Sequence, residues 1–238
     1  MKANYNQTTA HHYAAYRPPL HSMILERVLG DSSTFSKGLD VGCGTGYSTL
    51  ALAKYCKTVT GIDPSQSMLE RSAQRPGVNY LQGSAEDIPL PDHSIGIATF
   101  AGSLFYTDRN LVSIEIRRVC KTDALIIPYD FEILLDEQLN MLDLDHPQTE
   151  TEYDHTINFS GMDGFKEIIN KQEQVTIECT GTQLAHLFLS NADQYDKIAE
   201  KYETENPFKN LGEILRKAGN HFFVKANLFY TKYQLKEE

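Results

Sequence analysis

Residues 39–46 read Leu-Asp-Val-Gly-Cys-Gly-Thr-Gly, and residues 59–63 read Val-Thr-Gly-Ile-Asp. The first stretch is the end of an apolar strand and a loop with glycine at every second position: Gly42, Gly44 and Gly46. Glycine lets the backbone turn sharply and approach a ligand where a Cβ atom would collide. The second stretch is an apolar strand that ends in Asp63, whose carboxylate can accept hydrogen bonds from a ribose diol. The pattern predicts a nucleoside-binding site in an α/β sheet.

The spacing of the glycines distinguishes between two kinds of ligand. Dinucleotide loops have the pattern Gly-x-Gly-x-x-Gly, and the pyrophosphate lies on the helix N-terminus. Here the third glycine comes one residue early, so Tyr47 stands where that pattern has glycine. Asp40 lies two residues before the first glycine, where a carboxylate would repel a pyrophosphate but suits an ammonium group. S-adenosylmethionine has a ribose, an amino group, a sulfonium and no phosphate, so the charges favour it.

Further segments match a known family in the order in which they occur along the chain. Besides the glycine loop, they are the second-strand motif 63–69, the adenine-side loop 82–92, the helix end 118–121 and the N-terminal segment 13–18. With these segments the chain resembles the class I S-adenosylmethionine-dependent methyltransferases, in their small-molecule branch. The resemblance implies an α/β fold with a doubly wound, mostly parallel, seven-stranded sheet and an insertion after the fifth strand.

The resemblance also implies S-adenosyl-L-methionine as the cofactor and a set of residues that contact it. The predicted cofactor-binding residues are Tyr16, Arg17, Asp40, Gly42, Cys43, Gly44, Asp63, Pro64, Met68, Ser84, Ala85, Glu86, Phe100 and Ala101. No metal is expected, and no catalytic residue is identified.

Some of these residues have a second interpretation. Asp40 would hold the methionine end of the cofactor through water or backbone amides, or it would only brace the loop. Asp63 would bind the ribose, or it would simply cap the next helix. Met68 would pack near the adenine, or it would be a buried helix residue. Cys43 is expected to be a small buried loop residue rather than a nucleophile.

The adenine-side loop departs from the family pattern at one position. Relatives commonly carry Gly-Asp-Ala-Glu where this chain has Gly83-Ser84-Ala85-Glu86. A serine hydroxyl can accept a hydrogen bond from the adenine amino group, but less strongly than a carboxylate does. Either Ser84 makes this bond more weakly, or Glu86 or Asp87 takes over.

A general base is not evident from the sequence. Relatives often have histidine where this chain has Phe105 and Tyr106, which the resemblance places near the transferred methyl group. Transfer from a sulfonium depends more on a positioned nucleophile than on a base, so the absence does not argue against activity. His146 and His155 lie among carboxylates and are candidate bases, with solvated loop residues as the alternative. His11 and His12 are adjacent and would diverge on a helix, so a shared metal is not expected.

The composition is typical of a compact cytosolic enzyme. Of 238 residues, 41% are hydrophobic, enough for a sizeable core, and no stretch approaches the ~18–20 apolar residues of a membrane helix. The first residues lack the apolar stretch of a signal peptide. The net charge of −10 argues against a nucleic-acid substrate. The four cysteines are scattered and indicate neither a zinc site nor disulfides: Cys43, Cys56, Cys120 and Cys179.

The pattern along the chain predicts alternating helices and strands within one domain over 1–238. The expected helices cover 19–29, 47–55, 65–75, 109–120, 182–189 and 193–203, and the expected strands cover 37–41, 58–62, 78–81, 95–100, 124–128, 175–179 and 221–233. Residues 131–172 are acidic and too irregular for a confident assignment, and we interpret them as an insertion that covers the substrate.

The N-terminal segment 1–30 is expected to cover the cofactor edge. Arg17 could pair with the cofactor carboxylate, and Tyr13 and Tyr16 could close over the sulfonium. The alternative is an Arg-Pro turn that packs on the rim.

The sequence therefore predicts an enzyme that transfers a methyl group to an oxygen, nitrogen or carbon nucleophile of a small molecule. Neither a nucleic-acid nor a membrane partner is expected, and the oligomeric state is open. One alternative is a non-catalytic protein that binds S-adenosylmethionine for regulation, which the departures at Ser84, Phe105 and Tyr106 keep open. A nicotinamide-dependent oxidoreductase is a second alternative, against which Tyr47 argues.

Overall fold

The computed structural model describes residues 9, 11–12, 15–30, 34–144 and 152–236. Its packing divides the chain into two compact units. The sheet unit comprises Pro19–Glu132, Tyr153–Glu173 and Leu228–Glu238, and the helical unit comprises Met1–Pro18, Ile133–Glu152 and Gln174–Asn227. Each unit has a hydrophobic core of its own. Among the described residues, no helix has both the length and the apolar character to span a membrane.

The elements alternate along the first half of the chain as the sequence predicts. They are α2 (Leu20–Leu29), β1 (Phe35–Val41), α3 (Tyr47–Leu52), β2 (Cys56–Asp63), α4 (Gln66–Leu69), β3 (Val78–Gln82), β4 (Ile95–Ala101), the 3-10 helix η1 (Leu104–Tyr106), α5 (Arg109–Val119) and β5 (Cys120–Leu134). The second half contains α6 (Asp136–Met141), β6 (Phe165–Thr180), α7 (Gly181–Leu189), α8 (Ala192–Lys201), α9 (Pro207–Ala218) and β7 (His221–Leu235).

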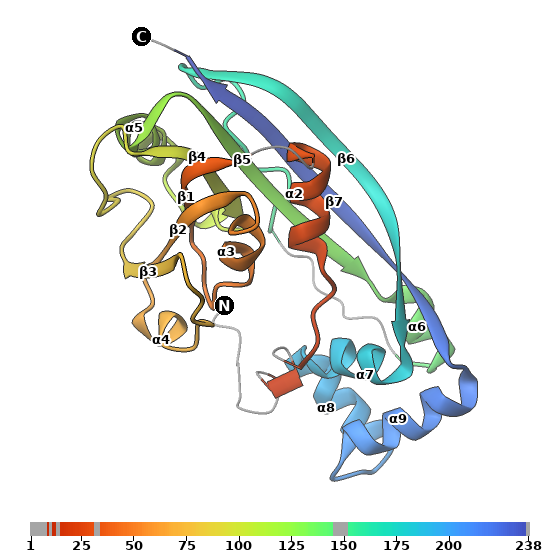
Figure 1. Ribbon diagram of the computed structural model, residues 1–238. Coiled ribbons are helices and arrows are strands. Elements are labelled where there is room, and N and C mark those ends of the chain that lie inside the picture. Colours follow the sequence, from red (N-terminus) through yellow and green to blue (C-terminus); the bar gives the residue numbers. More distant parts are fainter. Residues whose placement is uncertain (1–8, 10, 13–14, 31–33, 145–151, 237–238) are drawn as a thin grey trace. The chain divides into compact units, whose positions relative to one another are not determined.

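The seven strands form one sheet in the order β3-β2-β1-β4-β5-β7-β6, which can be followed in Figure 1. The pairs β3–β2, β2–β1, β1–β4 and β4–β5 are parallel. This confirms the predicted doubly wound, mostly parallel, seven-stranded sheet. The chain order reverses between β1 and β4, and ligands of such sheets bind outside the carboxyl ends of the strands at this reversal. The fold therefore brings the loops after β1, β2 and β4 to one edge.

The core of the sheet unit explains why its central strands are apolar on both faces. β1 and β4 are covered on both sides, so that Leu39, Val41 and Ile97 are fully or almost fully buried. Phe159 stacks on Phe165 with ring centroids 4.5 Å apart and belongs to the same core. The rigid centre of the sheet thus holds the edge loops in place.

The predicted helix over 65–75 is wrong in length, since α4 ends at Leu69. The Ser65 side chain does not cap this helix and lies instead 3.0 Å from the hydroxyl of Ser67. Beyond α4, the Ser72 hydroxyl donates to the carbonyls of Met68 and Gly44, both at 3.4 Å. Such side-chain bonds to the backbone compete with helix continuation.

The predicted lengths of the fifth and sixth strands are also wrong. β5 and β6 extend from both sides into 131–172, which the sequence analysis left unassigned, and α6 lies inside it. β6 is an edge strand with mostly exposed residues, among them Lys166, Glu167 and Lys171. Charged residues are usual on an edge strand, and they hide the apolar alternation that a sequence pattern needs.

The helical unit packs α7, α8 and α9 around a second core. Leu184 and Phe188 of α7 and Leu211 and Leu215 of α9 are fully buried there. Thr180 and Gln183 form a capping box at the start of α7. The sequence analysis did not predict α9, although Asn206 caps it and Pro207 occupies its first turn. These two residues are a usual helix-start signal.

His12 is buried in the helical unit and hydrogen-bonded to a second histidine. Its Nδ1 lies 2.9 Å from Nδ1 of His186, and its ring is tilted against that of Phe208 at 5.2 Å. Burial, together with the nearby His186 and His11, lowers the pKa of His12 from 6.5 to about 4. The fold therefore favours the neutral imidazole.

We expect the helical unit to lose stability as the pH falls from about 6.5 to about 4. The unfolded chain takes up a proton on His12 near pH 6.5 and the folded chain only near pH 4. The contribution is therefore fully present above pH 6.5, and its loss amounts to about 3 kcal/mol at most. Denaturant titrations at pH 7.5 and 5, followed by hydrogen exchange over residues 181–218, measure it. His12→Asn keeps a polar partner for His186 but cannot be protonated, so an unchanged pH dependence in this variant would contradict the assignment.

Candidate active site

The loop after β1 is held against the end of β2 by backbone hydrogen bonds. The amides of Gly42 and Cys43 both donate to the carbonyl of Ile62, at 2.8 and 2.9 Å, and the amide of Gly46 donates to the carbonyl of Cys43 at 2.9 Å. Gly42, Gly44 and Gly46 have φ values of 70°, 53° and 87°, which glycine adopts without strain. The glycine pattern therefore makes a tight turn whose backbone faces outward from the sheet edge.

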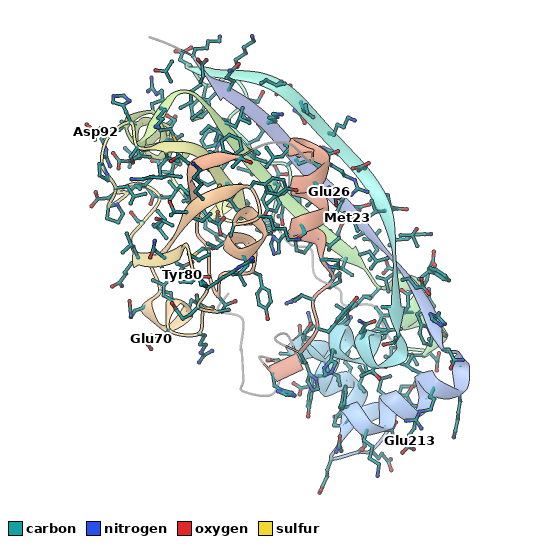
Figure 2. The ribbon with its side chains drawn as sticks, in the orientation of Figure 1. Met23, Glu26, Glu70, Tyr80, Asp92 and Glu213 are labelled. Carbon is teal, nitrogen blue, oxygen red and sulfur yellow. The ribbon has the colours of Figure 1, made fainter. Side chains whose placement is uncertain are left out.

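The three glycines serve different purposes. A Cβ atom on Gly42 would collide with the side chain of Ser103, and one on Gly46 would collide with Tyr80 of β3, which is labelled in Figure 2. A Cβ atom on Gly44 would meet no protein atom within 4 Å. Gly42 and Gly46 are thus needed for packing, whereas the space beside Gly44 is free for a ligand to approach the backbone.

Asp63 ends β2 beside this space. Its Oδ2 accepts a hydrogen bond from the amide of Gly44 at 2.8 Å, and its Oδ1 accepts one from the amide of Ser65 at 2.9 Å. The two interpretations of Asp63 were ribose binding and capping of the next helix. The structure leaves both possible, because the carboxylate braces the turn at Ser65 and also adjoins the glycine loop. A carboxylate has about four acceptor sites, so each oxygen can still accept a ribose hydroxyl. Contact with the ribose stays a prediction.

Asp40 is fully buried and bonded to three hydroxyl groups. Ser48 and Thr49 of α3 donate to its Oδ2 at 2.6 and 2.7 Å, and Thr99 of β4 donates to its Oδ1 at 2.8 Å. Burial raises the pKa of Asp40, and the three hydroxyls work in the opposite direction. The carboxylate therefore ties β1, α3 and β4 together, as in the bracing interpretation, and a direct contact with the cofactor stays a prediction.

Cys43 is buried beneath the loop. Burial, followed by the charges of Asp40 and Asp63, raises the pKa of its thiol far above the usual range. A protonated thiol is a poor nucleophile. This agrees with the expected role of a small loop residue.

The residues predicted on the adenine side lie around the loops after β2 and β3. Pro64 is exposed and Met68 is 38% exposed, so the interpretation of Met68 as a buried helix residue is wrong. Ser84 pairs with Asp87 in an isolated β-bridge, and Ala85 is buried. These positions leave the thioether of Met68 available to an adenine ring.

Glu86 has a partner that the sequence did not indicate. Its Oε1 accepts a hydrogen bond from the amide of Asp108 at 3.0 Å, at the start of α5. The carboxylate thereby ties the adenine-side loop to α5, and whether it also receives the adenine amino group stays a prediction, as it does for Ser84.

The end of β4 differs from the expectation for Phe100. Its side chain is buried in the core with its ring edge-on to Phe159 at 5.4 Å, whereas Ala101 is half-buried. Ser103 follows and donates its hydroxyl to the carbonyl of Val41 at 2.5 Å, which fixes the β4 loop beside the glycine loop. Any contact of Phe100 with the cofactor therefore has to come from its backbone.

Tyr16 and Arg17 belong to the helical unit. Tyr16 packs against the core of that unit, and burial raises the pKa of its hydroxyl. Their predicted contacts with the cofactor stay predictions. Tyr13 and His146 lie outside the described residues.

The sequence analysis did not identify a polar cluster around Asp130, which lies in the second half of β5. Oδ2 of Asp130 lies 2.8 Å from the hydroxyl of Tyr153 and 2.8 Å from Nδ1 of His155. Tyr153 also donates to the carbonyl of Gly102 at 2.9 Å, directly after β4. In the sequence, only the residue types hinted at this cluster. The positions of Asp130 and of Tyr153 and His155 do not reveal that these side chains are in contact.

Three aromatic residues of the segment 131–172 differ in their surroundings. Phe159 and Phe165 are ordinary core residues. Tyr153 is half-buried, with its ring 4.5 Å from that of Phe105.

Within the part of the chain that the structure describes, no group of three or more His, Cys, Asp or Glu side chains could hold a metal ion.

The fold and the loop together define the class of this domain. A sheet with the reversal between β1 and β4, a glycine loop beside free space and a carboxylate at the end of β2 suit a nucleoside ligand. Tyr47, in place of the third glycine of the dinucleotide pattern, argues against a pyrophosphate.

Comparisons with known proteins agree. Residues 39–127 match the family described as a methyltransferase domain. The uncharacterised methyltransferase YcgJ of Bacillus subtilis is 35% identical over 116 residues, 44% of this chain and 46% of YcgJ. Demethylmenaquinone methyltransferase of Staphylococcus aureus is 34% identical over 117 residues, 45% of this chain and 48% of that protein. Residues 39–127 are therefore similar to a methyltransferase domain, and this similarity supports S-adenosylmethionine as the cofactor.

The similarity extends beyond the matched domain only at the level of the fold. A structure assigned to a type II methyltransferase from Anaeromyxobacter dehalogenans has a TM-score of 0.67 at 19% identity and covers 94% of this chain and 100% of that one. The chain spans about half the length of the curated relatives it matches.

Proposed function

We propose that the protein transfers a methyl group from S-adenosylmethionine to an oxygen, nitrogen or carbon atom of a small molecule. The observation that carries the proposal is the position of Asp63, whose carboxylate holds the Gly44 amide at 2.8 Å beside space free of protein atoms. When bound, S-adenosylmethionine supplies a methyl group on a sulfonium, a leaving group that is already activated.

The cofactor would be held by residues of the sheet unit. The backbone of 42–44 would lie against it, Asp63 would accept the ribose hydroxyls, and Met68 would cover the adenine, with Ser84 or Glu86 at the adenine edge. A sulfur atom against an aromatic ring contributes about 0.3–1.5 kcal/mol. In this arrangement the chain would orient the cofactor, and the resemblance implies that the loop after β4 would lie near the methyl group.

Two observations support a small-molecule acceptor. The net charge of −10 disfavours the phosphate contacts on which nucleic-acid binding depends. The name of the Staphylococcus aureus relative indicates that it methylates demethylmenaquinone, a small molecule. A cytosolic location and the absence of membrane and nucleic-acid partners remain predictions from the composition.

Calorimetric titration and a labelled transfer test the proposal. We expect the purified protein to bind S-adenosylmethionine and not NAD, which distinguishes the methyltransferase from the oxidoreductase alternative. Incubation of a cell extract with methyl-labelled S-adenosylmethionine should then put label into its small molecules. Label in proteins or nucleic acids would contradict the acceptor class, and binding without any transfer would favour the non-catalytic regulatory alternative.

The two segments 1–30 and 131–172 are proposed to cover the cofactor edge and the substrate. If they close over bound ligand, they exclude water and position the acceptor. Hydrogen exchange over residues 13–17 and 131–172 is therefore expected to slow when S-adenosylhomocysteine, the product, is added. Protection confined to residues 40–90 would contradict this role, and a non-binding Asp63→Ala variant is the control for effects unrelated to the ligand.

A further inference from the structure

The polar cluster around Asp130 of β5 holds one histidine in a defined orientation. Oδ2 of Asp130 lies 2.8 Å from Nδ1 of His155, and Oδ1 of the same carboxylate accepts a hydrogen bond from the amide of Phe131 at 2.8 Å. The His155 ring stacks on Phe229 with centroids 5.3 Å apart and planes 10° apart. Both the position and the plane of the imidazole are therefore set by its neighbours.

These contacts also determine which ring nitrogen carries the proton. Burial and the charge of Asp130 raise the pKa of Tyr153 far above its usual range, so its hydroxyl remains a donor. An ionised carboxylate can only accept hydrogen bonds, and Nδ1 of His155 must therefore carry a proton to bond with Asp130. The lone pair of a neutral ring is then on Nε2, which has no hydrogen-bond partner among the described residues.

A hollow of the sheet unit adjoins this ring. It has a volume of about 220 Å³, and His155 lines it together with Pro128, Asn158, Asn170, Lys171 and Phe229. His155 also lines a smaller hollow with Gly102, Phe105 and Tyr153, next to the loop after β4. The imidazole thus lies between a polar hollow of small-molecule size and the loop that the resemblance places near the methyl group.

Gly102 lets the cluster approach the β4 loop. It has a φ of 69°, and a Cβ atom on it would lie 3.0 Å from Oδ1 of Asp130 and 3.2 Å from the Tyr153 hydroxyl. A side chain there would press against both groups. The close approach of the β4 loop to Asp130 and Tyr153 therefore depends on this glycine.

We propose that His155 is the general base of the methyl transfer and that the acceptor is a hydroxyl compound bound in the 220 Å³ hollow. This rests on the proposed function. As the acceptor oxygen bonds to the methyl carbon, the electron pair of the carbon–sulfur bond stays on sulfur and the hydroxyl proton moves to Nε2 of His155, then to water. Asp130 and Tyr153 are positioning residues: Asp130 holds the tautomer of His155, and Tyr153 holds the carboxylate of Asp130.

The tautomer is tested without any acceptor. Long-range ¹H–¹⁵N spectra of ¹⁵N-histidine-labelled protein with bound S-adenosylhomocysteine are recorded at pH 8, and the His155 signals are assigned by their loss in His155→Gln. We expect the neutral ring to carry its proton on Nδ1 and to shift toward the Nε2–H form in Asp130→Asn, whose amide can donate to Nδ1. A ring protonated on Nε2 in the unaltered protein would overturn the proposal.

The role as a base is tested with phenol and thiophenol as probe acceptors at pH 8. Phenol, like tyrosine, ionises only near about pH 10, whereas thiophenol is already ionised and needs no base. We expect His155→Gln to lower kcat/KM for phenol about 100-fold or more and that for thiophenol less than about 3-fold. The dissociation constant of S-adenosylmethionine should not change. His93→Gln, which alters a histidine bonded to the carbonyl of Cys120, is the matched control and should retain both rates.

Equal losses for the two probes, or none for phenol, would overturn the assignment of His155 as base. If the unaltered protein methylates neither probe, the proposed function fails for these acceptors, and the tautomer then decides whether His155 is held as a base.

Discussion

Asp63→Ala is expected to weaken S-adenosylmethionine binding by about 2–4 kcal/mol, or roughly 30- to 1,000-fold. Each ribose hydroxyl bonded to the charged carboxylate contributes about 1.5–3 kcal/mol, and the two contributions are not fully additive. The same substitution removes the 2.8 Å bond to the Gly44 amide, which loosens the loop in the direction of weaker binding. Isothermal titration calorimetry on the folded variant measures the effect.

Asp63→Asn is the control that distinguishes the loss of the ribose contacts from the loss of the turn at Ser65. The asparagine oxygen can still accept from the amide of Ser65 but carries no charge, so this variant should bind with intermediate affinity. If Asp63→Ala binds with unchanged affinity while remaining folded, the ribose assignment is wrong.

Gly44→Val is expected to abolish measurable cofactor binding. Gly44 has a φ of 53°, and a Cβ atom on it would point into space that contains no protein atom within 4 Å. A branched side chain would fill the space where the cofactor approaches the backbone. It would also strain the loop, since a left-handed conformation costs a residue with a Cβ atom about 1–2 kcal/mol.

Gly161→Val is the control that distinguishes backbone strain in the loop from a side chain that blocks the cofactor. Gly161 has a φ of 77° and equally free surroundings, but it lies in the turn after Phe159 rather than in the cofactor loop. We expect both variants to lose similar stability in thermal unfolding and only Gly44→Val to lose binding. A structure with the cofactor bound anywhere other than above residues 40–46 would contradict the site.

The candidate cofactor site could be located in the sequence because the residues that indicate it are close together in the chain. The glycine loop and Asp63 lie within 25 residues of each other, and they follow strands whose apolar runs indicate burial in a parallel sheet. The predicted doubly wound, seven-stranded sheet is confirmed for this reason. The roles that remained open, those of Asp40 and Met68, depend on neighbours that the spacing does not reveal.

The second half of the chain could be predicted only in part. α7 and α8 have regular apolar spacing and were located to within two residues at each end. β6 was predicted over 175–179 only, because its exposed edge needs few apolar residues and its pairing with β7 supplies the backbone hydrogen bonds. A strand stabilised by its partner carries a weak signal in its own residues.

What the sequence by itself determined is the class of fold and the glycine loop of the candidate site, since both follow from residue types at short, regular spacing. The cofactor follows from the resemblance that these residues carry. Only the tertiary structure decided that Asp40 is a brace between Ser48, Thr49 and Thr99, and that Asp130 meets Tyr153 and His155. These partners are 8 to 59 and 23 to 25 residues apart. The repeating patterns of helices and strands do not relate residues at such separations. The folding of the chain alone brings them together.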